Sequence, residues 1–263
     1  MISTDHPLRY SVHSRLREFH LRRLMSGRRG GILLDVGCGL GYLSETLGEG
    51  FTCVGLEADP ESLALNKSRG LANMVRGSAS RLPFKPDSID AIICSEVLEH
   101  LPEGLDEEAL RESCRVLKPG GRLYLTVPSL EGLRATTSLR NLGHETPGSG
   151  EYHYRMGYSW AAMSGMLGRI PGLRVADKTY SMFLASELFM DMVKWVYFRK
   201  NKLKEHSDLI GVKKSPLFRA YRRAFPLMHL FFVAEDLLLC RLFRGHILIL
   251  ALEKTGATSP GRS

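Results

Sequence analysis

Asp35 and three alternating glycines, Gly37, Gly39 and Gly41, stand together in the stretch ILLDVGCGLGYL at residues 32–43. The apolar run before them is typical of a buried strand, and the residues after Gly41 fit the start of a helix. Glycine admits positive φ and lets a ligand lie directly against the backbone. The stretch therefore predicts a ligand-binding turn between a strand and a helix, and the alternative is a tight turn that binds nothing.

The spacing of the glycines indicates which ligand this turn suits. It reads GxGxG, which is neither the GxGxxG of dinucleotide sites nor the GxxxxGK[ST] of phosphate loops. A carboxylate at Asp35 would repel phosphate and favour a ligand that carries an ammonium group. Glu57 ends the next apolar run, where a carboxylate can accept both hydroxyls of a ribose. A nucleoside with an amino-acid tail and no phosphates fits these features, and S-adenosylmethionine is such a molecule.

Apolar runs alternate with helical patterns through the first two-thirds of the chain. The runs predict strands at 31–37, 52–58, 72–77, 89–95 and 122–128, and helices near 41–48, 60–69 and 106–117. This alternation predicts βαβ units and a parallel sheet. Further on, the pattern predicts a helix at 159–168, strands at 172–180 and 245–254, and helical structure over 181–244, with Pro226 kinking or restarting the second helix there.

Five ordered blocks of the chain resemble the class I S-adenosylmethionine-dependent methyltransferases. They read LLDVGCGLG, VGLEADPESL, GSASRLPF, IDAIICSEVLEHL and RVLKPGGRLYLTVP, cover about residues 30–128, and continue more weakly to 180. The EHL sequence is similar to that of relatives that modify small molecules and lipid precursors. The resemblance implies an α/β fold: a Rossmann-like, seven-stranded, mostly parallel sheet with helices on both faces and a helical insertion before the last strand. It also implies S-adenosylmethionine as the cofactor.

The resemblance also assigns roles by position. Asp35 and the glycine loop would hold the methionine moiety, Glu57 the ribose, and Ala58 the adenine. Ser78 stands where the family often has an acidic residue, so its hydroxyl or the Ala79 backbone would have to make the adenine contact. The implied cofactor-binding set is Asp35, Gly37, Cys38, Gly39, Gly41, Glu57, Ala58, Ser78, Ala79, Ser95 and Glu96.

Two histidines are candidates for acid–base chemistry. Methyl transfer from a sulfonium depends largely on positioning, and a base is needed only if the acceptor must lose a proton. His100 in EVLEHLP and His153 in EYHYRMGYS are the catalytic candidates, with Tyr154, Arg155 and Tyr158 on the substrate side. The alternatives are structural histidines and tyrosines that only pack. No metal site is expected, because the five cysteines form no CxxC pair and no histidine cluster lies near them.

Positive charge is concentrated in one part of the chain. The net charge is +8, and residues 194–223 hold ten Lys or Arg against two acidic residues. Apolar helical faces beside this charge favour a helix in a membrane interface that attracts anionic lipid. No apolar run reaches the ~20 residues of a spanning helix. The alternatives are a helical cap on the sheet or a homodimer contact.

These observations predict methyl transfer to a small-molecule or lipid-like acceptor, in one interpretation at a membrane surface. The alternatives are a tRNA methyltransferase, disfavoured because the chain has no separate RNA-binding module, and a non-catalytic S-adenosylmethionine-binding protein. The expected location is the cytoplasm, peripherally on the inner face of a membrane in the first interpretation, because the start has no secretory pattern. The methyltransferase domain is expected over 1–180 and 245–254, with a helical segment at 1–30, a lid at 129–158, an insertion at 181–244 and a tail at 255–263.

Overall fold

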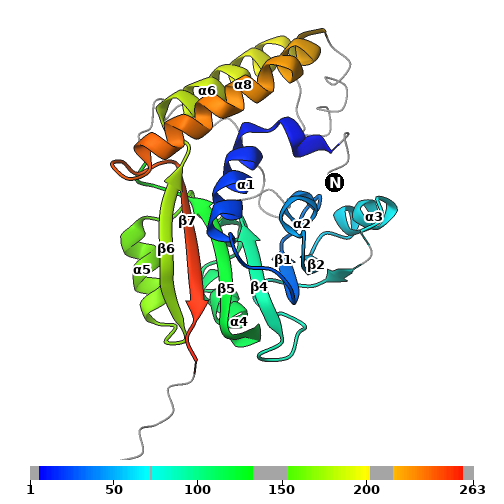
Figure 1. Ribbon diagram of the computed structural model, residues 1–263, viewed down its shortest axis with the longest axis vertical. Helices are drawn as coiled ribbons and strands as arrows, with labels where there is room; N and C mark the ends of the chain where they lie inside the picture. The colour runs from blue at the N-terminus through cyan, green and yellow to red at the C-terminus, as the bar shows by residue number, and fades with distance from the viewer. Residues whose placement is uncertain (1–5, 72, 133–152, 202–215, 257–263) are drawn as a thin grey trace, which may run out of the picture.

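The computed structural model describes residues 6–71, 73–132, 153–201 and 216–256, and a seven-stranded sheet forms its centre (Figure 1). The strand order is β3-β2-β1-β4-β5-β7-β6. The strands are β1 Ile32–Val36, β2 Thr52–Glu57, β3 Met74–Arg76, β4 Ile89–Ser95, β5 Leu117–Pro128, β6 Leu173–Ser181 and β7 Ile247–Lys254. Neighbouring strands from β3 to β5 pair in parallel, whereas β7 runs antiparallel between β5 and β6. The predicted fold class is confirmed.

Strand β5 begins earlier than the sequence indicates. The apolar pattern predicts a strand from residue 122, but extended structure begins at Leu117. Leu117 pairs with Ile89 of β4, and the pairing resumes at Arg122 opposite Ala91 after an irregularity. The glycine turn in LKPGG is therefore incorporated in the strand rather than preceding it.

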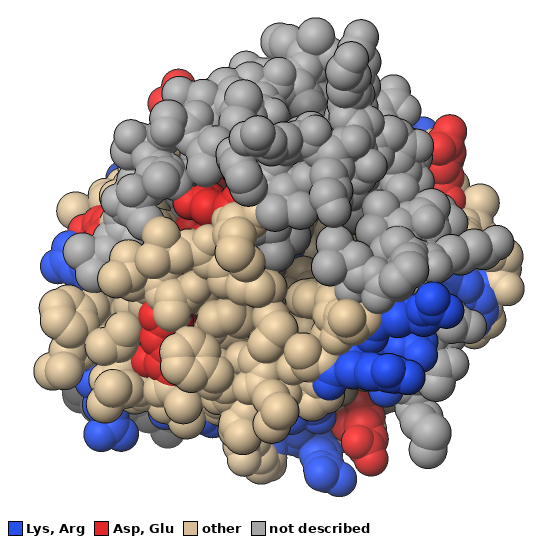
Figure 2. All heavy atoms as spheres, turned by 90° about the horizontal axis from the view of Figure 1, so that it is seen from above, with Lys and Arg blue, Asp and Glu red and all other residues tan. Residues whose placement is uncertain are grey.

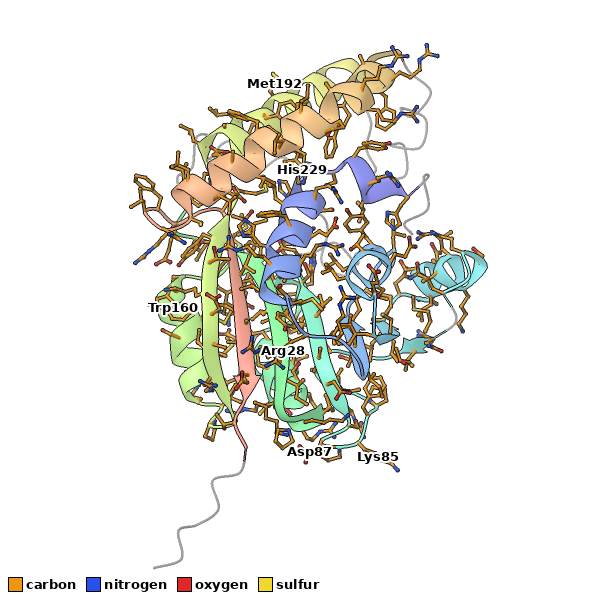
Figure 3. All side chains as sticks on the ribbon, in the orientation of Figure 1. Arg28, Lys85, Asp87, Trp160, Met192 and His229 are labelled. Carbon is orange, nitrogen blue, oxygen red and sulfur yellow. The ribbon has the colours of Figure 1, made fainter. Side chains whose placement is uncertain are left out.

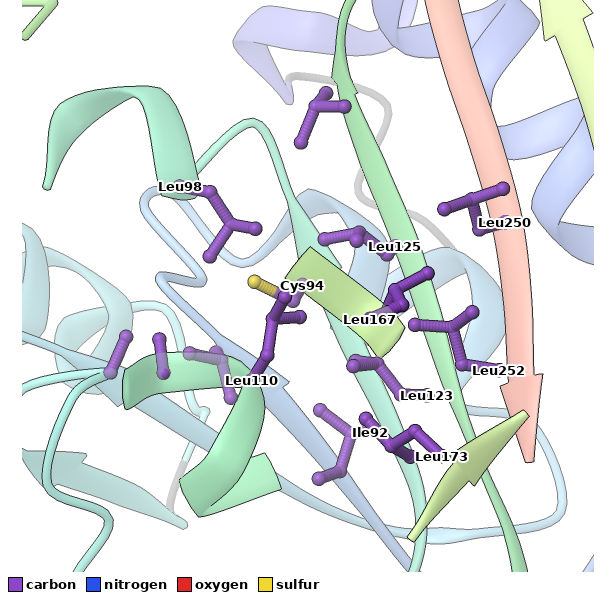
Figure 4. Packing of buried hydrophobic residues seen from close by; sticks show 14 of the residues in the cluster. Ile92, Cys94, Leu98, Leu110, Leu123, Leu125, Leu167, Leu173, Leu250 and Leu252 are labelled. Carbon is purple, nitrogen blue, oxygen red and sulfur yellow. The ribbon is translucent and has the colours of Figure 1, made fainter. Parts of the chain in front are cut away.

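Helices cover both faces of the sheet. They are α1 Val12–Leu24, α2 Tyr42–Leu47, α3 Pro60–Ser68, α4 Leu105–Val116, α5 Trp160–Gly168, α6 Leu184–Asn201 and α8 Pro216–Leu239, with 3-10 turns η1 Pro7–Tyr10 and η2 Leu98–His100. One apolar cluster packs Leu110 of α4 and Leu167 of α5 against the sheet (Figure 4). A second cluster, on the other face, packs Leu16 of α1 and Phe232 of α8. The sheet therefore has a buried core on each side.

Helix α1 positions the helix that follows the glycine loop. Glu18 is 5% exposed although it is charged, and its Oε2 accepts a hydrogen bond from Tyr42 Oη at 2.7 Å. Arg15 and Arg22 pair with the same carboxylate, which compensates the cost of burying it. The N-terminal segment thus holds the first turn of α2 in place.

The insertion forms two helices, α6 and α8, that contact each other and lie over α1 (Figure 1). His229 of α8 and Met192 of α6 are labelled in Figure 3, and Met192 is about half exposed. Of the predicted kink or restart at Pro226, the restart is wrong, because α8 continues through this residue, and the kink stays a prediction. Packing on both sides supports the helix: Tyr221 Oη donates to Tyr10 O at 2.6 Å, and buried Asp236 accepts from Met182 N at 3.1 Å.

Parts of the predicted organisation fall outside the described residues. They are most of the lid, at 133–152, the connection at 202–215, and the tail from 257. The predicted domain boundaries therefore stay predictions. In the part of the chain that is described, none of the helices combines the length and the apolar character needed to span a bilayer.

Candidate functional site

The loop between β1 and α2 bends at its three glycines, which all have positive φ: 65° at Gly37, 49° at Gly39 and 73° at Gly41. A β-carbon on Gly37 would lie 2.5 Å from Val97 Cγ2, and one on Gly41 would lie 2.5 Å from Leu71 Cδ1. A β-carbon on Gly39 would meet no atom within 4 Å. Gly37 and Gly41 therefore allow close packing, whereas Gly39 is the point at which the loop opens to a ligand.

The backbone N–H groups of this loop are used inside the protein. Those of Gly37 and Cys38 donate to Leu56 O at 2.8 and 3.1 Å, and that of Gly39 donates to Glu57 Oε2 at 2.8 Å. A phosphate-binding loop aims such groups at the anion instead. The loop is therefore poorly suited to a pyrophosphate, in agreement with its glycine spacing.

Asp35 lies behind the loop. The sequence had led us to expect that its carboxylate would face the ligand, and in the structure it does not. Its side chain is buried, and Oδ2 accepts hydrogen bonds from Ser44 N at 3.0 Å and Ser44 Oγ at 2.6 Å. Burial raises the pKa of Asp35 to about 6, although the Ser44 bonds oppose the shift. Asp35 therefore anchors α2 and contributes charge to the site without an open path to a ligand.

Glu57 ends β2 beside the loop. Its Oε1 accepts from the N–H groups of Ala58 and Asp59 at 2.8 and 3.0 Å, and Oε2 accepts from Gly39. A carboxylate oxygen has two acceptor positions, so one stays open on Oε2 with respect to the described residues. One ribose hydroxyl fits that position, and binding of the second requires a backbone N–H to move. Ala58 is exposed beside it.

Ser78 and Ala79 follow β3. Ser78 is exposed, and its Oγ lies 2.9 Å from Ser80 Oγ. Ala79 is 7% exposed and belongs to the core cluster. Its side chain therefore points into the protein, and only its backbone is suited to contact an adenine.

At the end of β4, Ser95 and Glu96 meet side chains from two other elements. Thr126 Oγ1 of β5 lies 2.9 Å from Ser95 Oγ and donates to Glu96 Oε1 at 2.9 Å. Arg17 of α1 donates to Ser95 Oγ at 3.3 Å, and its Nη1 lies 3.8 Å from Glu96 Oε1. Sequence reasoning missed Thr126 and Arg17. The polar end of a buried strand could have indicated Thr126, but nothing local indicates Arg17.

The structure brings the two candidate catalytic histidines together. The ring centroids of His100 and His153 are 4.4 Å apart, and the rings are perpendicular. The backbone holds this arrangement, because the N–H groups of Tyr154 and Arg155 donate to Glu99 O at 2.8 and 3.2 Å. The segment after residue 152 is thus attached to the 3-10 turn that follows β4.

Glu99, beside His100, is a buried acid that sequence reasoning also missed. It is 1% exposed, and no donor among the described residues reaches its Oε2. Burial raises the pKa of Glu99 well above its ordinary value, and the charge of Glu96 adds to the shift. The available signal was an acidic residue between the apolar positions Leu98 and Leu101.

The three predicted substrate residues have different surroundings. Tyr158 is 1% exposed and donates from Oη to Asp106 Oδ2 at 3.0 Å. Arg155 Nε lies 3.1 Å from the same oxygen, whereas Tyr154 is half exposed. The burial of Tyr158 does not fit the predicted contact with a substrate. Its hydroxyl instead attaches the segment around residue 158 to α4 through Asp106. Tyr154 is the most exposed of the three.

Acidic groups dominate the electrostatics at the ends of β1 and β4. The charges of Glu99, Asp35 and Glu96 all add to the effect of burial in raising the pKa of the Cys94 thiol. Glu57 in turn raises the pKa of Asp35. In their ionised form these carboxylates stabilise a sulfonium or an ammonium group and disfavour phosphate.

The sheet is open, with a glycine loop after β1, a carboxylate ending β2 and β7 antiparallel between β5 and β6, and this arrangement is that of a Rossmann-like methyltransferase fold. Residues 34–125 match the family model described as a methyltransferase domain. This segment is therefore similar to the methyltransferase domains of S-adenosylmethionine-dependent methyltransferases.

Similar proteins include the ubiquinone biosynthesis O-methyltransferase of Xylella fastidiosa, 36% identical over 110 residues. That match covers 39% of this chain and 42% of the relative, so it spans less than half of each protein. Among solved structures, the [4+2]-cyclase SpnF has a TM-score of 0.56 at 20% identity, covering 92% of this chain and 82% of the other. A phosphoethanolamine N-methyltransferase of Haemonchus contortus with S-adenosyl-L-methionine has a TM-score of 0.57 at 14% identity, covering 91% and 52%. These structures share the fold.

The residues present fit S-adenosylmethionine. Gly39 has open space above it, Glu57 has an acceptor position for a ribose hydroxyl, and the acidic field suits the positive charges of the ligand. Within the described residues, no three His, Cys, Asp or Glu side chains are grouped to hold a metal ion.

Proposed function

We propose that the protein transfers a methyl group from S-adenosylmethionine to a small-molecule or lipid-like acceptor bound beside His100 and His153. The ring contact of 4.4 Å between these histidines carries the proposal. The position of the histidine pair also supports the proposal. The carbonyl oxygen of Val97 accepts a hydrogen bond from the His100 N–H at 3.0 Å, and the Val97 side chain packs against Gly37. The histidine pair therefore lies next to the glycine loop.

The sulfonium supplies an activated methyl group, and the protein's part is to orient the reactants and move a proton. We assign orientation of the adenosyl part to Gly39 and Glu57. For a hydroxyl acceptor, one imidazole of the histidine pair takes the proton as the new O–C bond forms and the methyl–sulfur bond breaks, with S-adenosylhomocysteine as the leaving group. The neighbouring ring fixes the orientation of the first by edge-to-face contact. Tyr154, half exposed next to His153, lines the acceptor side.

A hydroxyl on an apolar acceptor is the substrate class that we favour. One relative is named for O-methylation in ubiquinone biosynthesis, which motivates an aromatic hydroxyl on an apolar molecule. Such acceptors partition into bilayers, and the α6–α8 pair has a suitable surface. Its exposed apolar side chains are Leu184, Leu188, Met192, Leu227, Leu230, Phe231, Leu237 and Leu238. We therefore propose that this surface lies in the interface of an anionic membrane.

The experiment that tests the activity uses S-adenosylmethionine with an isotopically labelled methyl group. The purified protein is incubated with it and with total lipid and metabolite extracts, and the products are separated into lipid, water-soluble and RNA fractions. We expect label in an apolar small molecule, and about 10²–10⁴-fold less with the variant H100A/H153A if the pair supplies the base. Label confined to RNA, or no transfer to any fraction, would overturn the proposal.

A further inference from the structure

A pocket of about 550 Å³ lies away from the glycine loop. It is formed by the second half of α1, the edge strand β6 and the connection from α8 to β7. Because β6 ends the strand order, this pocket is at the side of the molecule opposite to β3. None of the residues to which we assign a role in methyl transfer lines this pocket.

Basic side chains dominate the walls of the pocket. Arg23, Lys178, Arg241 and Arg244 line it, with Asp177 as its one acidic residue. Arg244 pairs with Glu131, and Lys178 Nζ lies 4.0 Å from the ring centre of Trp160 on α5. Trp160 is labelled in Figure 3.

Two arginines of this pocket have guanidinium groups that pair with no carboxylate among the described residues. Arg23 and Arg241 are exposed and make no ion pair with any of the described residues. A guanidinium binds a phosphate through two parallel N–H···O bonds, so the pair is suited to a phosphate group.

The pocket opens onto an apolar surface. Leu242 and Phe243 belong to its lining and are 73% and 49% exposed. Leu238, Phe231 and Leu227 of α8 are 71%, 59% and 75% exposed, and their spacing of four and seven residues places them on one side of the helix. Figure 2 looks down on the α6–α8 end of the molecule and shows a broad area that is neither basic nor acidic; the main group of Lys and Arg atoms in this view lies on the right, away from the side of β6. A pocket with basic walls therefore continues into an apolar stripe.

We propose that this pocket binds the phosphate headgroup of an anionic phospholipid. Arg23 and Arg241 hold the phosphate, and the acyl chains lie along the exposed leucines of α8. A free phosphate would make the same contacts with the arginines but would leave this apolar surface exposed to water. This inference rests on the membrane association in the proposed function. It adds that the protein selects membranes by the headgroup of their lipids.

The test measures binding of dihexanoyl phosphatidylglycerol below its micelle concentration by calorimetry. Dihexanoyl phosphatidylcholine and inorganic phosphate are the comparison ligands. We expect the variant R23Q/R241Q to lose at least about tenfold in affinity for phosphatidylglycerol, because each arginine makes a charge-assisted bond. The matched variant K67Q/K85Q removes two exposed cations outside the pocket and outside the α6–α8 pair, and it should bind as the wild type does.

Equal losses in both variants, or no loss in R23Q/R241Q, would overturn the pocket assignment. Inorganic phosphate binding as tightly as phosphatidylglycerol would overturn the lipid as its ligand. Flotation on vesicles of phosphatidylglycerol and phosphatidylcholine tests membrane association separately. Protein that floats without discriminating between the short-chain lipids overturns the pocket and leaves the proposed function intact. Protein that binds phosphatidylglycerol through Arg23 and Arg241 but does not float overturns the membrane association alone.

Discussion

Replacing Gly39 with alanine should separate ligand binding from folding. A β-carbon at this position meets no protein atom within 4 Å, so it causes no clash in the free protein. The cost to folding comes from the φ of 49°, about 1–2 kcal/mol for a residue with a side chain. The lower entropy of the unfolded alanine chain offsets about 0.4–1 kcal/mol of this. The net loss of stability is therefore about 1 kcal/mol, or roughly 2–4 °C in Tm.

The same β-carbon should occupy space that the cosubstrate needs. Forcing one methyl group into a packed contact costs about 1–3 kcal/mol, which lowers affinity roughly 5- to 150-fold. The assay is calorimetric titration of S-adenosylhomocysteine, with thermal unfolding on the same samples. Gly120 is a matched control, since its φ is 77°, a β-carbon there also meets no atom within 4 Å, and it lies in β5 before the paired segment that begins at Arg122.

The control variant G120A should lose similar stability and no affinity. If G39A binds the ligand as tightly as the wild type does, the ligand does not lie over Gly39 and the assignment of this loop fails. If G39A and G120A lose equal affinity, the loss reflects general destabilisation, which also contradicts the reasoning.

Three further predictions follow from the site. The variant H100A/H153A should keep its affinity for S-adenosylhomocysteine within about twofold while its kcat falls about 10²–10⁴-fold; a comparable loss of affinity would assign the pair to cosubstrate binding instead. Because the pKa of Asp35 is raised to about 6 from 3.8, its protonation stabilises the fold, and this contribution is complete below about pH 3.8 and lost as the pH rises through 6. The free energy of unfolding in urea, D35N minus wild type, should therefore be about 2–3 kcal/mol larger at pH 7.5 than at pH 3.5. If this difference is the same at both pH values, the buried environment of Asp35 is refuted. Y158F should lose about 1–3 kcal/mol of stability, measured by urea unfolding, because Asp106 loses a buried donor, and unchanged stability would show that this bond matters little.

Local sequence patterns determined the sheet and the glycine loop. Strand and helix periodicities depend on neighbouring residues, so the order of elements from β1 to β5 could be predicted from apolar runs and turn residues. The positive φ values at Gly37, Gly39 and Gly41 follow from residue type in the same way. Glu57 was found for a related reason, because the end of a strand is visible in the sequence.

Tertiary packing decided which way the site's side chains face. Asp35 was identified correctly as an acid beside the loop, but its burial against Ser44 depends on where α2 packs. Tyr158 belongs to a segment that reads as a lid, yet its hydroxyl is held by Asp106 from α4.

Contacts between distant parts of the chain could not be predicted from one sequence. Arg17 meets Ser95 across 78 positions, and His100 meets His153 across 53, with no local pattern linking either pair. The sequence by itself determined the elements and the bend at Gly39, because these depend on nearest neighbours and on backbone sterics. Only the tertiary structure decided the histidine pair and the basic pocket at Arg23 and Arg241, because both exist only where separate elements pack together.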